Sequence, residues 1–541
     1  MRLATVAALL LAAPAVAQEF KDNRQTNADR QKAAVESSYA TAPVEEQEVR
    51  SEGSVTVDGR RLPYMATAGT LTIRDVEGKP TASMFYTAYT LDGQRGRAGA
   101  GGRPVTFFFN GGPGSPTMWL HMGSFGPVRI QTGNPEYVRP APYPVAANPY
   151  TLLDKSDLVF LDAIGAGYSR ALGDTKPQTF YGVDEDVDAF ARAITRWVTK
   201  NARWNSPKFL FGESYGTLRN GALAYQLQDR GMALNGVVLF SSIMNYGYRQ
   251  PGLDQIYVNY IPSYAATAWY HNRLPNRPAT VDEVVRQARA FAVGPYAAAL
   301  GKGQLIGAAE REEVVRRMSE LTGLPADFII RSNLRVDLPR FQKELLRGTR
   351  QVVGRLDSRY VGYDADAAGE RPDTDVSSEA ISGAFIAAQN DHLSRTLGYK
   401  TELTYRPSAR DAPGWTWNWA HKPLGRSTGS QNNPNTAVDL AAAMRGNPYL
   451  KVLSMNGWYD MATPFFGAEF DLNHMMLEPA QQRNLRFTYY PAGHMMYLNP
   501  EALAQMKRDL SAWYDEAVDA ARSAAPPQAP SVAEAGLTPP N

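Results

Sequence analysis

The sequence predicts an α/β fold, in which a mostly parallel central sheet is interrupted by a largely helical insertion. Helical patterns such as residues 183–201 separate short apolar runs, as in strand–helix–strand units. The strand pattern fades after about residue 243 and returns at 450–457. The apolar runs suit strands that are covered on both faces, and they are VTFFFN (105–110), DLVFLD (157–162), KFLFG (208–212) and GVVLFS (236–241).

Other elements follow from residue periodicity. Alternating segments at 53–59, 69–75 and 82–91 are joined by Gly and Asp turns, so we expect antiparallel strands ahead of the parallel sheet. Residues 183–201 place Val183, Val187, Ile194 and Val198 largely on one face, which predicts a helix. The last predicted helix has Leu503, Met506, Leu510 and Trp513 at helical spacing.

The N-terminus has the features of a secretory signal peptide over residues 1–17. Arg2 precedes an apolar stretch, and Ala15-Val16-Ala17 fits the cleavage rule. The chain has no cysteine, which excludes disulfides and an N-terminal lipid anchor. A net charge of +2 with interspersed signs gives no footprint for nucleic acid or an anionic membrane. We expect an exported bacterial protein, periplasmic or secreted, with no membrane anchor.

The predicted core is discontinuous. Residues 18–50 form a polar, loosely held leader, and the α/β core takes residues 51–242 and 443–522. Residues 243–442 form a cap insertion over the site. Residues 523–541 are rich in Pro and Ala and are predicted to be disordered.

A candidate nucleophile lies between a predicted strand and a predicted helix. The stretch 208–223 reads KFLFGESYGTLRNGAL and centres on Gly212-Glu213-Ser214-Tyr215-Gly216. G-x-S-x-G in this context is a nucleophile elbow, a tight turn that exposes the serine hydroxyl above the sheet. The alternative is a serine that caps the following helix.

A serine nucleophile needs a histidine base and a carboxylate that orients it, in the order Ser, Asp or Glu, His. His494 follows an apolar strand, unlike His121, His271, His392, His421 and His474. Asp460 follows the strand at 450–457, and Asp162 is the alternative carboxylate. The predicted triad is therefore Ser214, Asp460 and His494.

The transition state also requires hydrogen-bond donors for an oxyanion. One donor is expected from the backbone N–H of Tyr215, directly after the nucleophile. FFFNGGPGSP (107–116) is the natural source of the other, because Gly111 and Gly112 let the backbone approach a substrate closely. A simple turn can use the same glycines.

These residues resemble the serine carboxypeptidases, which are exopeptidases with the α/β-hydrolase fold. The resemblance extends over about 400 residues through NGGPGSP (110–116), DLVFLDAIGAGYS (157–169), GESYG (212–216), NGWYDMATPFFG (456–467) and GHMMYL (493–498). It implies the triad above, an oxyanion hole from Gly112 and Tyr215, and binding of the substrate's C-terminal carboxylate by Asn110, Gly111 and Glu213. Ser115 stands where the family commonly has Cys.

The resemblance gives Glu213 a chemical role. Two carboxyl groups at hydrogen-bond distance share a proton, because both cannot easily be ionised. Glu213 would then recognise a free C-terminus at acidic pH without a cation. The alternative is that Glu213 only bonds a local backbone N–H.

The leading function is a serine carboxypeptidase that acts on peptides with a free C-terminus through an acyl-enzyme. An esterase or acyltransferase with the same triad is the alternative, because a fold does not fix the substrate. A binding protein with a vestigial site is the third reading. No cofactor or metal is indicated. The oligomeric state stays open.

Overall fold

The computed structural model describes residues 41–91, 102–412, 414–423 and 429–522. The predicted signal peptide, most of the predicted leader and the C-terminal tail lie outside these residues. Among the helices described, none is both long and apolar enough to cross a membrane.

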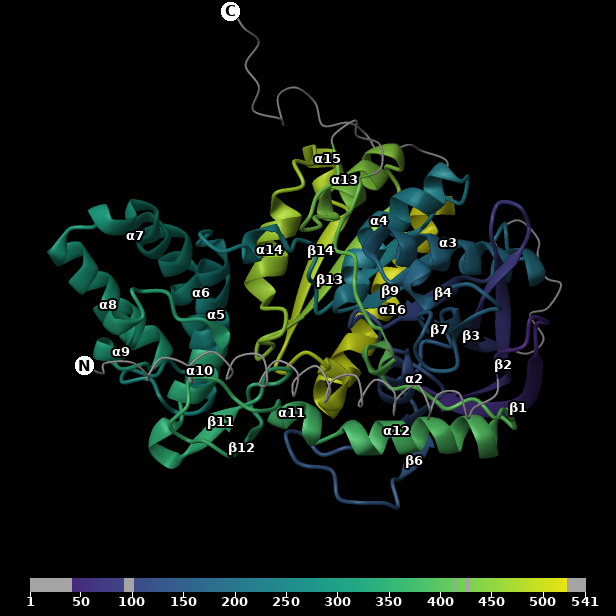
Figure 1. Cartoon of the computed structure of the whole chain (residues 1–541), viewed down its shortest axis with the longest axis horizontal. Coiled ribbons are helices and arrows are strands. Elements are labelled where there is room, and N and C mark those ends of the chain that lie inside the picture. The colour runs from purple at the N-terminus through teal and green to yellow at the C-terminus, as the bar shows by residue number, and fades with distance from the viewer. Residues whose placement is uncertain (1–40, 92–101, 413, 424–428, 523–541) are drawn as a thin grey trace, which may run out of the picture.

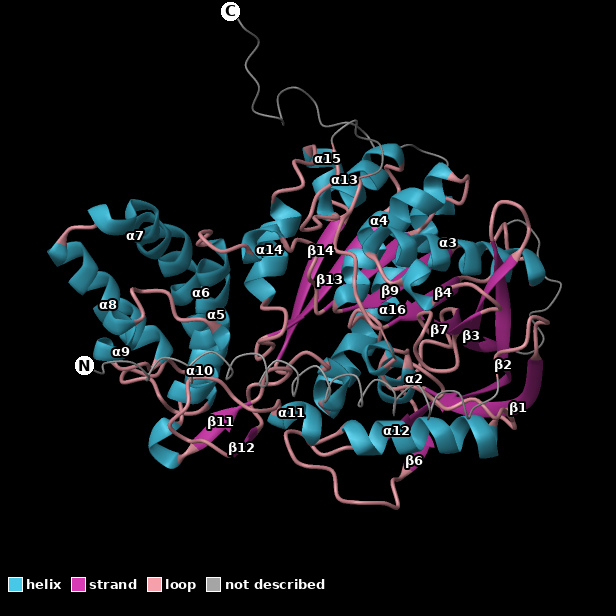
Figure 2. Cartoon of the chain, in the orientation of Figure 1, coloured by secondary structure: helices cyan, strands magenta, loops and turns pink. Residues whose placement is uncertain are grey.

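A central sheet runs through the molecule in the order β1-β2-β3-β7-β4-β9-β10-β13-β14 (Figures 1 and 2). The first three strands are antiparallel, and the strands from β7 to β14 are parallel. The expected strand types are confirmed. The strands are β1 Glu48–Val57, β2 Arg60–Arg74, β3 Pro80–Leu91, β4 Val105–Phe109, β7 Asp157–Leu161, β9 Lys208–Glu213, β10 Gly236–Phe240, β13 Lys451–Gly457 and β14 Leu485–Tyr490, with the short β8 Arg170–Ala171 beside β3.

Alternate residues of the buried strands pack into two hydrophobic clusters, one on each face of the sheet. In β4, Phe107 and Phe109 join one cluster and Phe108 joins the other. The first face is covered by α3 Val183–Lys200, α4 Tyr215–Asp229 and α13 Ala437–Gly446. The second face is covered by α2 Met118–Gly123, α12 Ser382–Asp391 and α16 Pro500–Arg522. This is the layered arrangement of an α/β-hydrolase fold.

The segment between β10 and β13 divides into two parts. Its first part is a lobe, seen beside α14 Phe465–Asn473 in Figure 1, and its hydrophobic cluster also takes in residues that follow β13 and Phe465 of α14. The lobe consists of α5 Gln255–Tyr270, α6 Val281–Phe291, α7 Ala297–Lys302, α8 Ala308–Thr322, α9 Ala326–Arg331 and α10 Leu338–Glu344, followed by the hairpin β11 Gln351–Val353 and β12 Val361–Tyr363.

The second part returns to the α/β core. After α11 Val376–Glu379, helix α12 packs against α2, and Tyr399 packs against Phe85 of β3 with ring centroids 4.9 Å apart. The single cap expected over residues 243–442 is therefore corrected to a lobe that is followed by a segment packed on the α/β core. Its boundary at 442 also cuts through α13, whose apolar residues belong to the core. The remaining elements are β5 Val128–Ile130, β6 Val145–Ala147 and α15 Pro479–Gln482.

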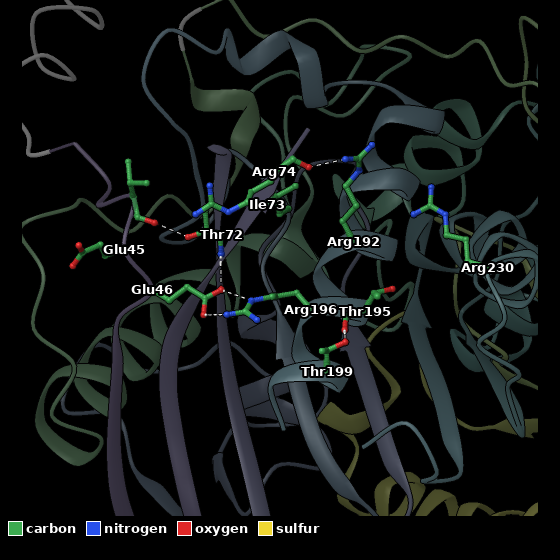
Figure 3. Close-up of a pocket in the computed structure, with 11 residues that line it drawn as sticks. Glu45, Glu46, Thr72, Ile73, Arg74, Arg192, Thr195, Arg196, Thr199 and Arg230 are labelled. Carbon is green, nitrogen blue, oxygen red and sulfur yellow. Dashed lines mark hydrogen bonds and ion pairs between the residues drawn. The ribbon is translucent and has the colours of Figure 1, made fainter. Parts of the chain in front are cut away.

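The end of the predicted leader is not loosely held. The hydroxyl of Thr72 donates to the carbonyl of Val44 at 2.6 Å, and the Thr72 N–H donates to Glu46 at 3.1 Å. Arg196 of α3 binds both carboxylate oxygens of Glu46, at 2.8 and 2.9 Å (Figure 3). Residues 48–50 already belong to β1. The leader therefore ends before residue 44, because its last residues contribute to the packing of the sheet edge.

Candidate active site

Ser214 occupies a sharp turn between β9 and α4. Its backbone has φ 61° and ψ −128°, a conformation that non-glycine residues avoid, and its side chain does not cap α4. A Cβ on Gly212 would lie 2.3 Å from the carbonyl oxygen of Gly216, and one on Gly216 would lie 2.9 Å from that of Phe109. Both glycines of the motif are therefore needed sterically. The turn has the geometry of a nucleophile elbow.

The two other predicted triad residues contact each other beyond the ends of β13 and β14. The Nδ1 atom of His494 lies 2.8 Å from Oδ2 of Asp460. Burial alone would lower the pKa of His494, but the Asp460 carboxylate raises it above its ordinary value. Asp460 is itself fixed, because its Oδ1 accepts from the N–H groups of Ala462 and Thr463 at 2.8 and 2.9 Å.

Two hydroxyl residues that the sequence analysis did not single out hold this pair in place. Thr463 donates to Oδ2 of Asp460 at 2.7 Å, and its oxygen lies 3.1 Å from Nδ1 of His494. Ser241 donates to the carbonyl of His494 at 2.6 Å. Thr463 lies within the motif at residues 456–467 that resembles the serine carboxypeptidases. Nothing in the sequence indicates a role for Ser241 except its position directly after β10.

The alternative carboxylate, Asp162, is engaged elsewhere. Its Oδ1 accepts from both the N–H and the hydroxyl of Thr117, each at 2.7 Å. Burial raises the pKa of Asp162 to about 6. This carboxylate therefore fixes the start of α2, and it does not orient His494.

The remaining histidines have other partners. His421 lies between two carboxylates, and although burial opposes its charge, hydrogen bonds to Asp184 and Asp439 raise its pKa to about 9. His121 and His392 both hydrogen-bond the hydroxyl of Tyr89, at 2.6 and 2.9 Å. His271 hydrogen-bonds the Ser358 carbonyl at 2.7 Å, and His474 hydrogen-bonds the Phe470 carbonyl at 2.6 Å. None of these five bonds a triad residue in the part of the chain described.

The loop that carries one predicted oxyanion donor, Gly112, lies against the elbow that carries the other, Tyr215. A Cβ on Gly111 would lie 2.4 Å from the backbone nitrogen of Tyr215, so the glycine loop packs directly on the elbow. Gly112 has φ +109°, which a residue with a side chain rarely adopts. Arg219 of α4 donates to the carbonyl of Asn110 at 2.9 Å and fixes the start of this loop.

Glu213 lies buried in a small group of polar side chains next to Ser214. The hydroxyl of Tyr497 lies 3.2 and 3.3 Å from its two carboxylate oxygens, and Asn110 also hydrogen-bonds the carboxyl group. The Oδ1 atom of Asn110 accepts from the N–H of Leu120 at 3.1 Å, so the amide NH2 is directed at Glu213. Burial raises the pKa of Glu213 to about 7. Its bonds are therefore to side chains, in contrast to the alternative of a local backbone bond.

The family comparison covers this part of the site. Residues 60–253 match the family model described as serine carboxypeptidase. The resemblance to the serine carboxypeptidases is confirmed. The match includes the glycine loop, Glu213 and Ser214, and it ends before Asp460 and His494. No curated protein sequence matches the chain.

Similar solved structures include a prohormone-processing carboxypeptidase from Saccharomyces cerevisiae, with 12% identity, a TM-score of 0.48, and coverage of 84% of this chain and 92% of that chain. A proline iminopeptidase from Mycobacterium smegmatis has 13% identity, a TM-score of 0.33, and coverage of 87% and 100%. A carboxyl esterase from Bacillus coagulans has 11% identity, a TM-score of 0.33, and coverage of 83% of this chain and 98% of that chain. The strand order and the elbow of this chain, rather than these scores, define its α/β-hydrolase fold.

Downstream of the serine carboxypeptidase match, the loop 354–360 between β11 and β12 binds both loops of the predicted triad. We call residues 354–360 the clamp loop. The N–H of His494 donates to the carbonyl of Leu356 at 2.6 Å, and the N–H of Gly493 donates to Asp357 at 3.2 Å. On the other side, the N–H of Ser358 donates to the carbonyl of Tyr459 at 3.0 Å. The inserted segment, where the sequence offered no motif, therefore positions His494 and Asp460.

Gly493→Ala is expected to disturb this contact and to lower kcat by about a hundredfold, because a displacement of 1 Å at a catalytic group has an effect of that order. The added Cβ would lie 2.4 Å from Cβ of Asp357. A Cβ at Gly348 meets no atom within 4 Å, so Gly348→Ala is the matched control. Steady-state kinetics separate kcat from KM in both variants. A Gly493→Ala protein with wild-type kcat would show that the clamp loop does not position His494.

Proposed function

We propose that the chain is an exported serine-type carboxypeptidase, which removes the C-terminal residue of peptides through an acyl-enzyme on Ser214 and prefers acidic pH. The observation that best supports this is the buried carboxyl of Glu213 directly beside the elbow, bonded to Asn110 and Tyr497. A generic esterase has no need of a carboxyl group there. A protonated carboxyl, in contrast, is a hydrogen-bond donor for the carboxylate of a free C-terminus.

In this proposal each group has one task. His494 takes the proton of Ser214 as the hydroxyl attacks the last peptide carbonyl, and Asp460 stabilises the imidazolium that forms. The N–H groups of Gly112 and Tyr215 stabilise the oxyanion. The C-terminal amino acid leaves with a proton from His494, and water then hydrolyses the acyl-enzyme by the same route.

The two buried titrating groups set the pH dependence. Hydrolysis of a free-acid peptide by the wild type requires neutral His494 and, for binding of the C-terminal carboxylate, protonated Glu213. The Glu213 anion contributes to the raised pKa of His494, and protonation of Glu213 removes that contribution. Because the pKa of Glu213 is about 7, kcat/KM for peptides should fall above that pH as Glu213 loses its proton. Towards low pH it should fall because His494 becomes charged.

Glu213→Gln is expected to remove most of the alkaline fall for free-acid peptides, even if the maximum rate decreases. The amide of Gln donates to an ionised carboxylate at any pH, whereas Glu213 donates only when protonated. The measurement is kcat/KM against pH for one peptide and for its C-terminal amide, in both proteins. The wild-type amide curve should lack the fall that Glu213 causes.

Tyr497→Phe is the matched control, because it changes the pKa of Glu213 and keeps the carboxyl. The Tyr497 hydroxyl favours the ionised form of Glu213, so its removal should move the alkaline limb to higher pH. If the acid and amide curves superimpose in the wild type, Glu213 does not recognise the C-terminus. The esterase or acyltransferase function would then be the better proposal.

A further inference from the structure

Two exposed arginines are anchored on the loops that carry predicted catalytic groups. Arg410 donates from Nη2 to the carbonyl of Gly112 at 2.8 Å, beside the predicted oxyanion hole. Arg249 donates from Nη2 to the carbonyl of Ala462 at 3.4 Å, and Ala462 follows Asp460 by two residues. Both guanidinium groups therefore lie at the edge of the candidate active site.

A third exposed arginine, Arg355, comes from the clamp loop. Its carbonyl accepts from the N–H of Met461 at 3.2 Å, so its backbone is fixed next to the loop of the triad aspartate. Its positive charge opposes protonation of His494, so Arg355 acts electrostatically on the predicted base. We call Arg249, Arg355 and Arg410 the rim arginines.

The rim arginines act electrostatically on one tyrosine. Burial raises the pKa of Tyr246, and the positive charges of all three rim arginines oppose that rise. The guanidinium of Arg249 lies 5.0 Å from the centroid of the Tyr246 ring. That ring packs on Trp419 at 4.8 Å, and Trp419 lies 6.2 Å from the ring of Tyr215, the residue after the nucleophile.

Among the described residues, the side chains of Arg249 and Arg410 donate to backbone carbonyls, and neither these two nor Arg355 forms an ion pair with a carboxylate. The nearby acids are engaged or neutral: Asp375 accepts from the N–H groups of Arg355 and Leu356, and burial raises the pKa of Asp471 to about 8. Asp411, next to Arg410, is exposed to solvent. A guanidinium has five N–H donors, so most donors of this group are available to a ligand.

We propose that the rim arginines bind an acidic side chain of the substrate, so that peptides with Asp or Glu adjacent to the scissile bond are preferred. This inference rests on the proposed carboxypeptidase function and adds a substrate class to it. Arginine suits this task because its planar donors match a carboxylate. The rim arginines are distinct from Glu213, which in the proposed function binds the C-terminal carboxylate of the peptide. A peptide would therefore present two anionic groups to two separate sets of donors.

The test compares peptides that have a blocked N-terminus and a free C-terminus. The peptides of a pair differ only by Glu or Gln, first at the last residue and then at the residue before it. The two side chains have nearly the same shape and differ in charge. We expect kcat/KM of the wild type to favour Glu about tenfold at one of the two positions. We also expect this preference to decrease as the salt concentration rises, because the charges lie at the edge of the site.

Arg355→Gln and Arg410→Gln should each reduce the Glu to Gln ratio about threefold or more. The ratio within one variant cancels any effect of the substitution on His494. Arg60→Gln, at an exposed position at the start of β2, is the matched control and should keep the ratio. Equal rates for Glu and Gln peptides in the wild type, or a ratio unchanged in both rim variants, would overturn the inference.

A second readout does not depend on peptide hydrolysis. Serine-reactive phosphonates with a Glu or a Gln side chain should inactivate the wild type at rates that differ in the same direction. Faster inactivation by the Glu compound without any peptide hydrolysis would support the rim arginines and refute the carboxypeptidase. Hydrolysis of the Gln peptide, with equal rates for both phosphonates, would refute the rim arginines and leave the carboxypeptidase standing. Failure of both compounds to react would contradict both proposals.

Discussion

Ser214→Ala should lower kcat by on the order of a million-fold, the effect typical of removing a triad nucleophile. Peptide binding should persist, because Asn110, Glu213 and the glycine loop are unchanged. The strained turn is retained, since Ala at φ 61° meets the same backbone restriction as Ser. Single-turnover assays and equilibrium binding of a peptide would measure the two effects separately.

Ser214→Gly is the control for folding in this experiment. Glycine adopts φ 61° without strain. The unfolding temperature of the Ser214→Gly protein should therefore be at least that of Ser214→Ala, while turnover is equally lost. Retention of more than a few per cent of wild-type activity by a pure Ser214→Ala sample would contradict the assignment of the nucleophile.

Asp460→Asn should lower kcat by roughly ten-thousand-fold. The Asp460 carboxylate accepts a hydrogen bond from Nδ1 of His494, which keeps the lone pair on Nε2 for the serine proton. An amide in its place no longer stabilises the imidazolium, and its NH2 group favours the wrong tautomer. The loss of the carboxylate should also lower the pKa of His494, because Asp460 is what raises it. The acid limb of kcat/KM against pH should therefore move to lower pH.

Asp162→Asn is the matched control, because it makes the same change in the other candidate carboxylate. The amide oxygen still accepts from Thr117, so most of the turnover should remain. A large loss in Asp162→Asn together with near-normal turnover in Asp460→Asn would exchange the roles of the two residues.

The sequence alone predicts those features that are determined by residues close to one another along the chain. The helix expected over residues 183–201 is present as α3, because its apolar residues repeat at helical spacing. Ser214 was found by the same means, since the steric need for Gly212 and Gly216 is encoded within five residues. The order of Ser, Asp and His along the chain selected Asp460 and His494, and the structure places these two in contact.

The features that the sequence did not predict depend on contacts between distant residues. The clamp loop binds His494 across more than 130 residues, and nothing in its composition marks that contact. The boundary expected at residue 442 falls inside α13, because the sequence of this segment does not say which surface it packs on. The anchor between Glu46 and Arg196 spans 150 residues, so the polar composition of residues 18–50 does not reveal it. Tyr497 lies within a recognised motif, but its bond to Glu213 becomes visible only when the two loops meet.

The most direct test of the central claim is the mass of the products formed from one peptide offered as the free acid and as the C-terminal amide. The wild-type protein should shorten the free acid one residue at a time from its C-terminus at pH below 7, and it should process the amide far more slowly. Ser214→Ala should leave both peptides intact. Cleavage at internal bonds, or equal processing of the acid and the amide, would contradict recognition of a free C-terminus by this site.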